Sequence, residues 1–294
     1  YLLGERQRLV GGLRHDRYSA DRYVYTTGTA NGSVDDNLNS GFLRFEQDLA
    51  GLPATWYLGL GRAQRAMDHW EATTYNGLTA AGALSPETNT QLDAGLLWNG
   101  KDLTGSLSAY YSNIDDYVLT RATRMCSMAG ACTSTNVDAT RYGLEADLAW
   151  RFQPNWTARG SYAYVRADND SMGVPLAQTP PQEMKLGLEY QTGPWTAGGL
   201  ARFVARQDRV HVGYGTIVGQ DLGETGGFAT FSLNGSYRVN KTTLVSAGID
   251  NLFDRAYAEH ISRAGAAVGG YEPATTRVNE PGRFFWVKAS FRLD

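Results

Sequence analysis

The chain has 294 residues, with 27 Lys and Arg against 30 Asp and Glu, so its formal net charge is −3. A charge this small gives no strong basic field and argues against nucleic acid as a partner. No segment approaches the roughly 20 apolar residues of a membrane-spanning helix. The 34 glycines, 17 tyrosines and 7 tryptophans are typical of a membrane β-barrel, in which aromatic residues lie at both membrane interfaces.

Alternation of apolar and polar residues with a period of two is the main signal along the chain. Between residues 140 and 152 the even positions are mostly apolar and end in Trp150 and Phe152, whereas the odd positions include Arg141, Glu145 and Asp147. One face of such a strand suits lipid and the other suits water. The sequence therefore predicts an all-β fold, a transmembrane antiparallel β-barrel wall of about twelve strands. The strands are predicted at residues 6–20, 39–49, 54–69, 90–98, 103–120, 139–152, 156–167, 182–191, 195–208, 228–237, 242–251 and 283–293.

The connections between the predicted strands alternate in length. Short turns are predicted at residues 50–53, 99–102, 153–155, 192–194 and 238–241. Long loops are predicted at residues 21–38, 70–89, 121–138, 168–181, 209–227 and 252–282. Outer-membrane barrels have short turns on the periplasmic side and longer loops outside. The pattern therefore predicts a protein of the cell outer membrane, with extracellular long loops and with short turns and the C-terminus in the periplasm.

Most of the tryptophans support this orientation, because they lie within a few residues of a short turn and on the apolar positions of their strands. An indole ring is most stable where it meets both the bilayer interior and water. We therefore predict a periplasmic aromatic girdle; the alternative is that these are ordinary core tryptophans. The predicted girdle consists of Trp56, Trp98, Trp150, Trp156 and Trp195.

The predicted strands either close on themselves or form part of a larger wall. An open sheet edge in lipid leaves unpaired N–H and C=O groups, so the whole protein must be closed. The sequence starts at Tyr1 without Met and without a basic-then-apolar leader. This start favours the larger wall, with more strands upstream.

Residues near the C-terminal end resemble those of a known family. One segment resembles the end of the penultimate strand in TonB-dependent receptors, and it consists of Asp250, Asn251, Leu252, Phe253 and Asp254. A second segment resembles their approach to the last strand, and it consists of Pro281, Gly282 and Arg283. Further stretches resemble one branch, the TonB-dependent copper receptors. They are residues 86–88, 91–93, 115–117, 175–178, 217–221, 256–260 and 276–283, so the resemblance covers most of the chain.

The resemblance implies a barrel of about 22 strands whose lumen is filled by a plug domain, with residues 1–294 as its C-terminal part. It implies energy from the TonB–ExbB–ExbD complex and uptake of a metal or metal complex, with copper as the transported ligand and iron–siderophore complexes as the alternative. Neither a plug nor a TonB box is found here. None of the four histidines is followed two residues later by Met, as the His-x-Met motif of the branch requires. The principal metal site is therefore expected outside this sequence, and no permanently bound cofactor is expected.

One cluster on a predicted outer loop carries candidate chemistry, and it contains Met125, Cys126, Met128 and Cys132. In an oxidising compartment the two cysteines are expected to form a disulfide, which would stabilise the hairpin tip by on the order of 2 kcal/mol. Thiolate and thioether sulfur also suit Cu(I). The two interpretations conflict in part, because an oxidised pair leaves only the methionines as ligands.

His69 and His211 lie near the outer ends of their predicted strands and are candidate copper ligands, although a lone histidine is more often a strand-end residue. The sequence contains no Gly-x-Ser-x-Gly, His-Glu-x-x-His or Cys-x-x-Cys pattern. We therefore expect a transporter and not an enzyme. The alternatives of another class are a stand-alone outer-membrane pore and a barrel enzyme.

Overall fold

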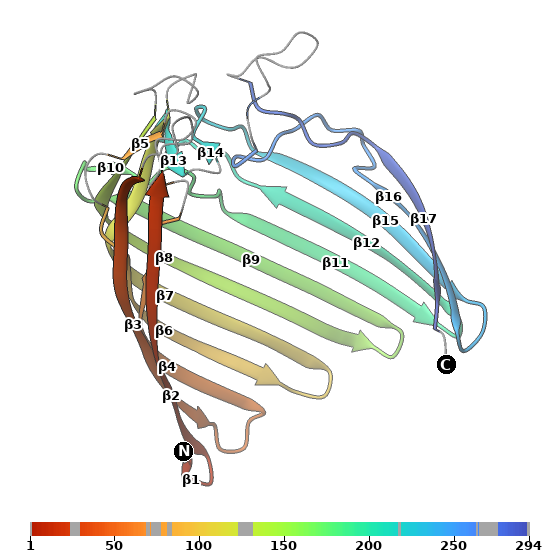
Figure 1. The fold of residues 1–294 in the computed structure, drawn as a ribbon. Coiled ribbons are helices and arrows are strands. Elements are labelled where there is room, and N and C mark those ends of the chain that lie inside the picture. The colour runs from red at the N-terminus through yellow and green to blue at the C-terminus, as the bar shows by residue number, and fades with distance from the viewer. Residues whose placement is uncertain are drawn as a thin grey trace.

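The structure is a computed structural model that describes residues 2–23, 30–68, 71, 78–80, 84–122, 132–216, 219–262, 264 and 276–292. Twelve long strands of the described residues form one sheet that curves around a concave face (Figure 1). They are β2 (Gln7–Tyr23), β3 (Ala30–Asp48), β4 (Ala54–Arg65), β6 (Glu87–Asn99), β7 (Leu103–Ala122), β8 (Cys132–Gln153), β9 (Trp156–Asn169), β11 (Glu183–Thr192), β12 (Trp195–Val204), β15 (Phe228–Arg238), β16 (Thr243–Asp250) and β17 (Phe284–Phe291). No helix within the described ranges is both long and apolar enough to cross a bilayer.

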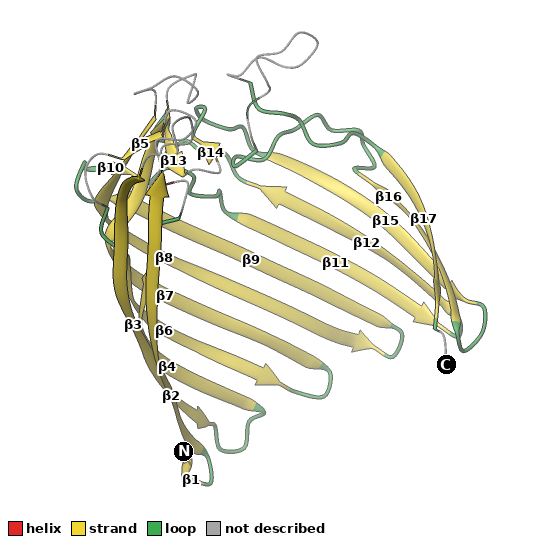
Figure 2. Cartoon of the chain, in the orientation of Figure 1, coloured by secondary structure: helices red, strands yellow, loops and turns green. Residues whose placement is uncertain are grey.

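Each long strand pairs with the next long strand along the chain, and every one of these pairings is antiparallel. Within the described residues, β2 and β17 each have one long neighbour, and the sheet is an open wall (Figure 2). In a bilayer both edges must be paired, because lipid offers no hydrogen bonds to a free strand edge. The described strands do not close a barrel by themselves.

All twelve predicted strands are present, which confirms the predicted fold class. The predicted loops at residues 21–38 and 121–138 are wrong over much of their length. β2 runs to Tyr23, β3 begins at Ala30 and β8 begins at Cys132. In these overhanging hairpins polar residues lie opposite one another, as Ser19 lies opposite Asp35. The alternation is lost there while the backbone pairing continues. β4 and β12 are shorter than predicted. Each ends four residues before its predicted last residue, which is 69 for β4 and 208 for β12.

Five short strands complete the described sheet: β1 (Leu2–Gly4), β5 (Leu78–Ala80), β10 (Val174–Pro175), β13 (Tyr214–Thr216) and β14 (Gly219–Gln220). All except β1 lie in predicted long loops. β5 pairs in parallel with β8, β10 pairs with β9, and β13 pairs with both β14 and β7. The end of the wall that carries the long connections, here called the loop end, therefore has paired backbone of its own.

The register separates two faces of the wall. Across neighbouring strands, Leu43 lies opposite Leu60, Leu60 opposite Leu92, and Leu92 opposite Tyr111. Leu60 is 56% exposed and Leu92 is 48% exposed, so this outer face carries a continuous apolar band with no protein cover. The concave, luminal face carries the alternate residues, such as Asp93 and Glu145. An uncovered apolar face opposite a polar one is the arrangement that a bilayer stabilises.

Glycine and aromatic residues are matched on the luminal face. Gly95 lies directly opposite Tyr57, and Gly143 lies directly opposite Tyr110. A Cβ on Gly95 would come 2.5 Å from the Tyr57 ring, and one on Gly143 would come 2.6 Å from Tyr110 Oη. The rings thus lie over bare backbone, a pairing that holds the strand register and covers the glycine. These glycines are required for close approach of the rings.

Buried apolar side chains gather at the loop end. One cluster contains Ile114, Leu119, Val137, Ala139, Ala167, Leu176 and Ala177, with Tyr117 and Tyr214 packed against it. Leu176, Ala177 and Tyr214 come from connections between strands, whereas the other members come from β7, β8 and β9. The connections therefore fold back onto the wall and form a small core with it.

Candidate functional site at the loop end

A cavity of about 690 Å³ lies at the loop end of the luminal face. The wall contributes Tyr110, Tyr117, Arg141 and Glu145 from β7 and β8. The connections contribute residues 176–181, together with Thr216 and Ile261. The cavity thus lies between the barrel wall and connections that fold inward.

The wall side of this cavity combines aromatic and charged groups. The Arg141 guanidinium carbon lies 5.9 Å from the centre of the Tyr110 ring. Its Nε is buried and has no hydrogen-bond partner among the described residues. Glu145 lies on the same face of β8, four residues and therefore two pleat repeats from Arg141. Most of the remaining lining is apolar, so the cavity presents a few polar groups in a largely apolar surround, as ligand sites commonly do.

The connection between β12 and β15 crosses the cavity as a strap, which we define as residues 205–216 and 219–227. β12 and β15 are direct neighbours, yet Tyr214 and Gly215 of the strap pair with Arg121 and Thr120 of β7. Three strands, β8, β9 and β11, lie between β7 and β12. The strap therefore spans four strand spacings, about 19 Å in total. Figure 1 shows β13 and β14 displaced from β12 and β15 toward the loop ends of the earlier strands.

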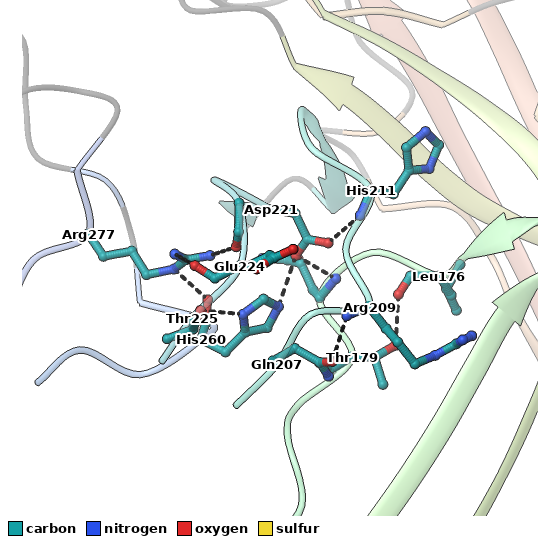
Figure 3. A network of polar contacts seen from close by, with 12 residues as sticks. Leu176, Thr179, Gln207, Arg209, His211, Asp221, Glu224, Thr225, His260 and Arg277 are labelled. Carbon is teal, nitrogen blue, oxygen red and sulfur yellow. Dashed lines mark hydrogen bonds and ion pairs between the residues drawn. The ribbon is translucent and has the colours of Figure 1, made fainter. Parts of the chain in front are cut away.

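Asp221 of the strap is the centre of a buried polar network (Figure 3). It is 1% exposed. Its Oδ1 accepts a hydrogen bond of 2.9 Å from the backbone N–H of Gln178, and its Oδ2 accepts one of 2.9 Å from the backbone N–H of His211. The Nε2 atom of His260 lies 3.3 Å from Oδ1. One carboxylate thus joins the β10–β11 connection to the strap by hydrogen bonds, and His260 of the β16–β17 connection lies beside it.

His260 and Arg277 carry the network into the last connection (Figure 3). The Nδ1 of His260, whose side chain is fully buried, lies 2.7 Å from Thr225 Oγ1 of the strap. Arg277 donates from Nη2 to the carbonyl of Gly223 at 2.6 Å and from Nε to the carbonyl of His260 at 3.0 Å. Burial lowers the pKa of Arg277, and the negative charge of Asp221 opposes that shift.

The residues that resemble the family motif form a hydrogen-bonded corner between β16 and β17. Asn251, 5% exposed, donates from Nδ2 to the carbonyls of Arg255 and Pro281, and its Oδ1 accepts from the backbone N–H of Arg255. Asp254 Oδ1 accepts from the backbone N–H of Arg283 at 2.8 Å. The corner therefore brings the two limbs of a long connection together where the last strand begins.

The other motif residues fit the same corner. The backbone N–H of Leu252 donates to the carbonyl of Phe231, and the Leu252 carbonyl accepts from Arg283 Nε. Phe253 is 68% exposed and its ring packs edge-on against Phe231 at 5.3 Å between centroids. A Cβ on Gly282 would lie 2.6 Å from Asp254 Oδ1, so a side chain there would crowd the carboxylate.

Most of the predicted metal ligands lie outside the described residues. This holds for His69, Met125, Cys126 and Met128, and for the side chain of Cys132, so the predicted disulfide stays a prediction. Across the described ranges, no group of three or more His, Cys, Asp and Glu is arranged to hold a metal ion.

His211 is the one predicted ligand whose side chain is described. Its ring stacks on Tyr214 with 3.8 Å between centroids, and its buried Nδ1 has no hydrogen-bond partner within the described residues. Burial lowers the pKa of His211, against a smaller opposite influence of Asp221. The neutral imidazole is therefore favoured. It lies in the strap, beside the network and not at its centre.

The five tryptophans of the predicted girdle lie on the outer-face positions near the short turns. Trp195 lies opposite Tyr237 with ring centroids 4.4 Å apart, and Trp156 lies opposite Tyr190 with centroids 4.7 Å apart. Phe152 contacts both Trp150 and Trp156. Trp56 packs on Phe45 at 5.3 Å, and Trp98 pairs with Ala54. Their membership of a membrane-interface girdle stays a prediction.

The network around Asp221 is the part of the site that sequence reasoning missed. Asp221 and His260 both lie in stretches quoted for the family resemblance, but no spacing connects them. A carboxylate, an imidazole and a hydroxyl in this order also occur in nucleophilic hydrolases. Here the imidazole is fully buried, and both the carboxylate and Thr225 join separate connections. The arrangement therefore acts first as a structural fastening.

A wall with an apolar outer face, a polar lumen, short turns at one end and long inward-folded connections at the other is the architecture of a large membrane-spanning β-barrel. The chain belongs to the family described as TonB dependent receptor-like, beta-barrel, whose family model matches residues 2–252. Barrels of this family lie in the outer membrane.

Solved structures and curated proteins agree with this assignment. The chain is similar to the copper transporter OprC, with a TM-score of 0.91 and 41% identity over 98% of this chain and 46% of that chain. It is 26% identical over 184 residues to a ferric-pyoverdine 358 receptor of Pseudomonas putida, which covers 59% of this chain and 22% of that protein. A ferric enterobactin receptor of Pseudomonas aeruginosa is 29% identical over 158 residues, 51% of this chain and 21% of that protein.

The chain thus spans less than half the length of the relatives it matches. A ferric-catecholate import receptor, Fiu from K12 E. coli, has a TM-score of 0.68 at 18% identity, with 98% of this chain and 43% of that chain covered. At that identity the likeness concerns the fold alone. These relatives are named as transporters or receptors.

Proposed function

We propose that this chain is the C-terminal part of the barrel of a TonB-dependent transporter that takes up a metal or metal complex, with copper as its cargo. The observation that supports copper is the likeness to a copper transporter, at 41% identity over nearly the whole chain. The ferric-siderophore receptors are 26% and 29% identical over only 59% and 51% of the chain. Iron–siderophore uptake is therefore the second candidate.

The proposed orientation places the strap and the cavity outside the cell and the short turns and C-terminus in the periplasm. Two features support it. The long connections all lie at one end of the wall, and outer-membrane barrels carry their long loops on the outside. The outer-face tryptophans near the short turns fit the periplasmic membrane interface, where an indole ring is most stable. The lipid of the outer membrane is then the first partner of the outer face.

We place the contact with the TonB–ExbB–ExbD complex in the part of the relatives' chains that this chain does not match. The principal metal site is placed there as well, because no group of metal ligands is found among the described residues. A barrel of about 22 strands filled by a plug is the expected whole. The wall described here then supplies part of the lumen and of the outer vestibule.

The segment with Met125, Cys126, Met128 and Cys132 is proposed as an outer loop that first meets the metal. Two thioether sulfurs suit Cu(I) even where the cysteines form a disulfide. Titration of Ag(I), a redox-inert mimic of Cu(I), into the full-length protein tests this. A Met125→Ala/Met128→Ala variant should lose the weaker binding phase, and an unchanged isotherm removes the loop from the metal path. Met172→Ala, which changes a methionine of another connection, is the matched control.

The function itself is tested by uptake. The full-length protein is produced in a strain that lacks its own copper and siderophore receptors, with and without TonB, and cell-associated copper and iron are measured by mass spectrometry. We expect copper to rise only where both the receptor and TonB are present. A TonB-dependent rise in iron supplied as a ferric siderophore, without a rise in copper, would transfer the assignment to the second candidate.

A further inference from the structure

The strap lies over the cavity and is fastened at a distance from its own strands. Its Thr216 lines the cavity, and its β13 pairs with β7 on the far side. Gln178 on the neighbouring connection also lines the cavity, and its Oε1 accepts a hydrogen bond from Thr216 Oγ1 at 3.1 Å. Two connections of the barrel therefore meet above one hollow.

Asp221 holds these connections through one carboxylate. Each oxygen accepts one backbone N–H, from Gln178 and from His211, and His260 approaches Oδ1. Its own backbone is also fixed, since its N–H donates to the Tyr214 carbonyl and its carbonyl accepts from Gly213. A buried carboxylate is tolerated only where such donors surround it. Without it, backbone donors from two connections lose their acceptor together.

Glycines in left-handed conformations stand on both sides of this fastened segment. Gly213 has φ +82° and Gly223 has φ +126°, and at these φ angles a residue with a side chain would be strained. Gly223 also offers its carbonyl to Arg277, so the third connection is held at this point. The backbone can change direction at both positions without a steric penalty, as hinge residues of lids do.

We propose that the strap is a lid over the luminal cavity and that Asp221 is its latch, so that the strap, the 176–182 connection and the 257–262 connection open and close as one unit. The latch residue positions the lid and is not itself a ligand. All three connections contribute to the lining of the cavity, so their joint movement changes the access to it. The proposal goes beyond the transport function and does not depend on which cargo is carried.

Amide hydrogen exchange of the full-length protein in lipid nanodiscs tests the latch. In Asp221→Asn the side chain keeps its size, but one acceptor becomes a donor that faces a backbone N–H. We expect exchange to become faster by about tenfold or more in all three segments together, as for one cooperative unit. Glu224→Gln is the matched control, because it changes an acidic residue of the same strap whose side chain is half exposed and pairs with Arg206. It should change exchange by less than about twofold.

Peptides from β9 and β11 show whether the barrel is intact, because their exchange should be the same in all variants. A faster exchange limited to residues 205–227, or no change in any segment, overturns the latch. An effect of Glu224→Gln as large as that of Asp221→Asn overturns it as well. Where Asp221→Asn fails to form a barrel, His260→Gln decides: faster exchange in all three segments supports one lid, whereas a change limited to residues 257–262 contradicts it.

Discussion

The wall within the apolar band and the loop end of the same barrel are built on different principles. In the band, side chains such as Leu60 and Leu92 face outward without any protein cover. Apart from Ala54, the buried apolar side chains of the described residues lie at the loop end. Backbone ladders and the surrounding lipid therefore hold the band, whereas packing and particular hydrogen bonds hold the loop end. A change of polarity should matter most in the band, and a change of a single partner should matter most at the loop end.

The largest effect is expected where a charge is placed on the outer face of the band. Leu107 lies on that face, opposite Leu96 and Ala146. Leu107→Arg should destabilise the barrel by about 2–4 kcal/mol, because a guanidinium in the bilayer loses its hydration. The measurement is the urea-unfolding midpoint of the full-length protein in lipid vesicles. The control is Ser106→Arg, which changes the preceding residue, on the luminal face. Equal losses of stability in both variants would contradict the assignment of the faces.

The corner at Asn251 gives the next largest effect, and it should stay local. Asn251→Ala removes two donated hydrogen bonds and one accepted hydrogen bond, and it puts a Cβ without a polar group at φ +48°. We expect the opening free energy of residues 251–256 and 281–283 to fall by about 2–3 kcal/mol in hydrogen exchange.

Asn251→Gly separates the two causes. It loses the same hydrogen bonds but tolerates the left-handed backbone, so it should be about 1 kcal/mol less damaging than alanine. If both variants lose the same amount, the backbone conformation of this corner contributes nothing measurable.

A luminal glycine should be sensitive only where a ring lies on it. Gly95→Ala brings a methyl group within 2.5 Å of three atoms of the Tyr57 side chain and should destabilise the barrel by about 1–2 kcal/mol through overpacking. At Gly59, which lies opposite Asp93 on the luminal face, the nearest atom to a Cβ is Arg44 Cβ at 3.7 Å, so Gly59→Ala should be neutral. Unfolding midpoints of both variants give the comparison. Restoration of stability in Gly95→Ala by Tyr57→Leu would show that the ring is the cause.

The same contrast explains what the sequence could predict. The strands of the band follow from alternation, because each residue there has one environment, lipid or lumen. The overhang of β2 and β3 was not predicted, since Asp35 and Ser19 are polar on paired strands. The strap has no periodic pattern, and its pairing with β7 depends on contacts far apart in the chain.

The role of Asp221 was beyond sequence reasoning for a related reason. Its partners Gln178 and His260 are 43 and 39 residues away, on two other connections. Nothing in the local sequence distinguishes this aspartate from an exposed loop residue. The corner at Asn251 was located only through the family resemblance, and its hydrogen bonds show why an amide side chain stands there.

The smallest expected effect is a pH dependence of the strap. Burial holds the pKa of His211 below its ordinary value, so the folded strap favours the neutral imidazole. Two charged groups lie near His211. The Asp221 carboxylate accepts a hydrogen bond from the His211 backbone N–H, and the Arg121 guanidinium lies over the ring of Tyr214, on which the His211 ring stacks. The unfolded segment then binds more protons than the folded one as pH falls through about 6.5. The stability of the strap is therefore complete above this pH and decreases below it.

Hydrogen exchange of residues 205–216 at pH 7.5 and pH 5.5, corrected for the intrinsic pH dependence of exchange, measures this decrease. His211→Phe keeps an aromatic ring against Tyr214 but cannot take up a proton, so its corrected exchange should be the same at both pH values. His15→Phe, on the exposed part of β2, should behave as the parent does. A parent protein without faster exchange at pH 5.5, or a His211→Phe variant that keeps the acid response, would show that another group controls the strap. In that case the difference between the two ends of the barrel is one of packing and fixed hydrogen bonds alone, without a titrating group.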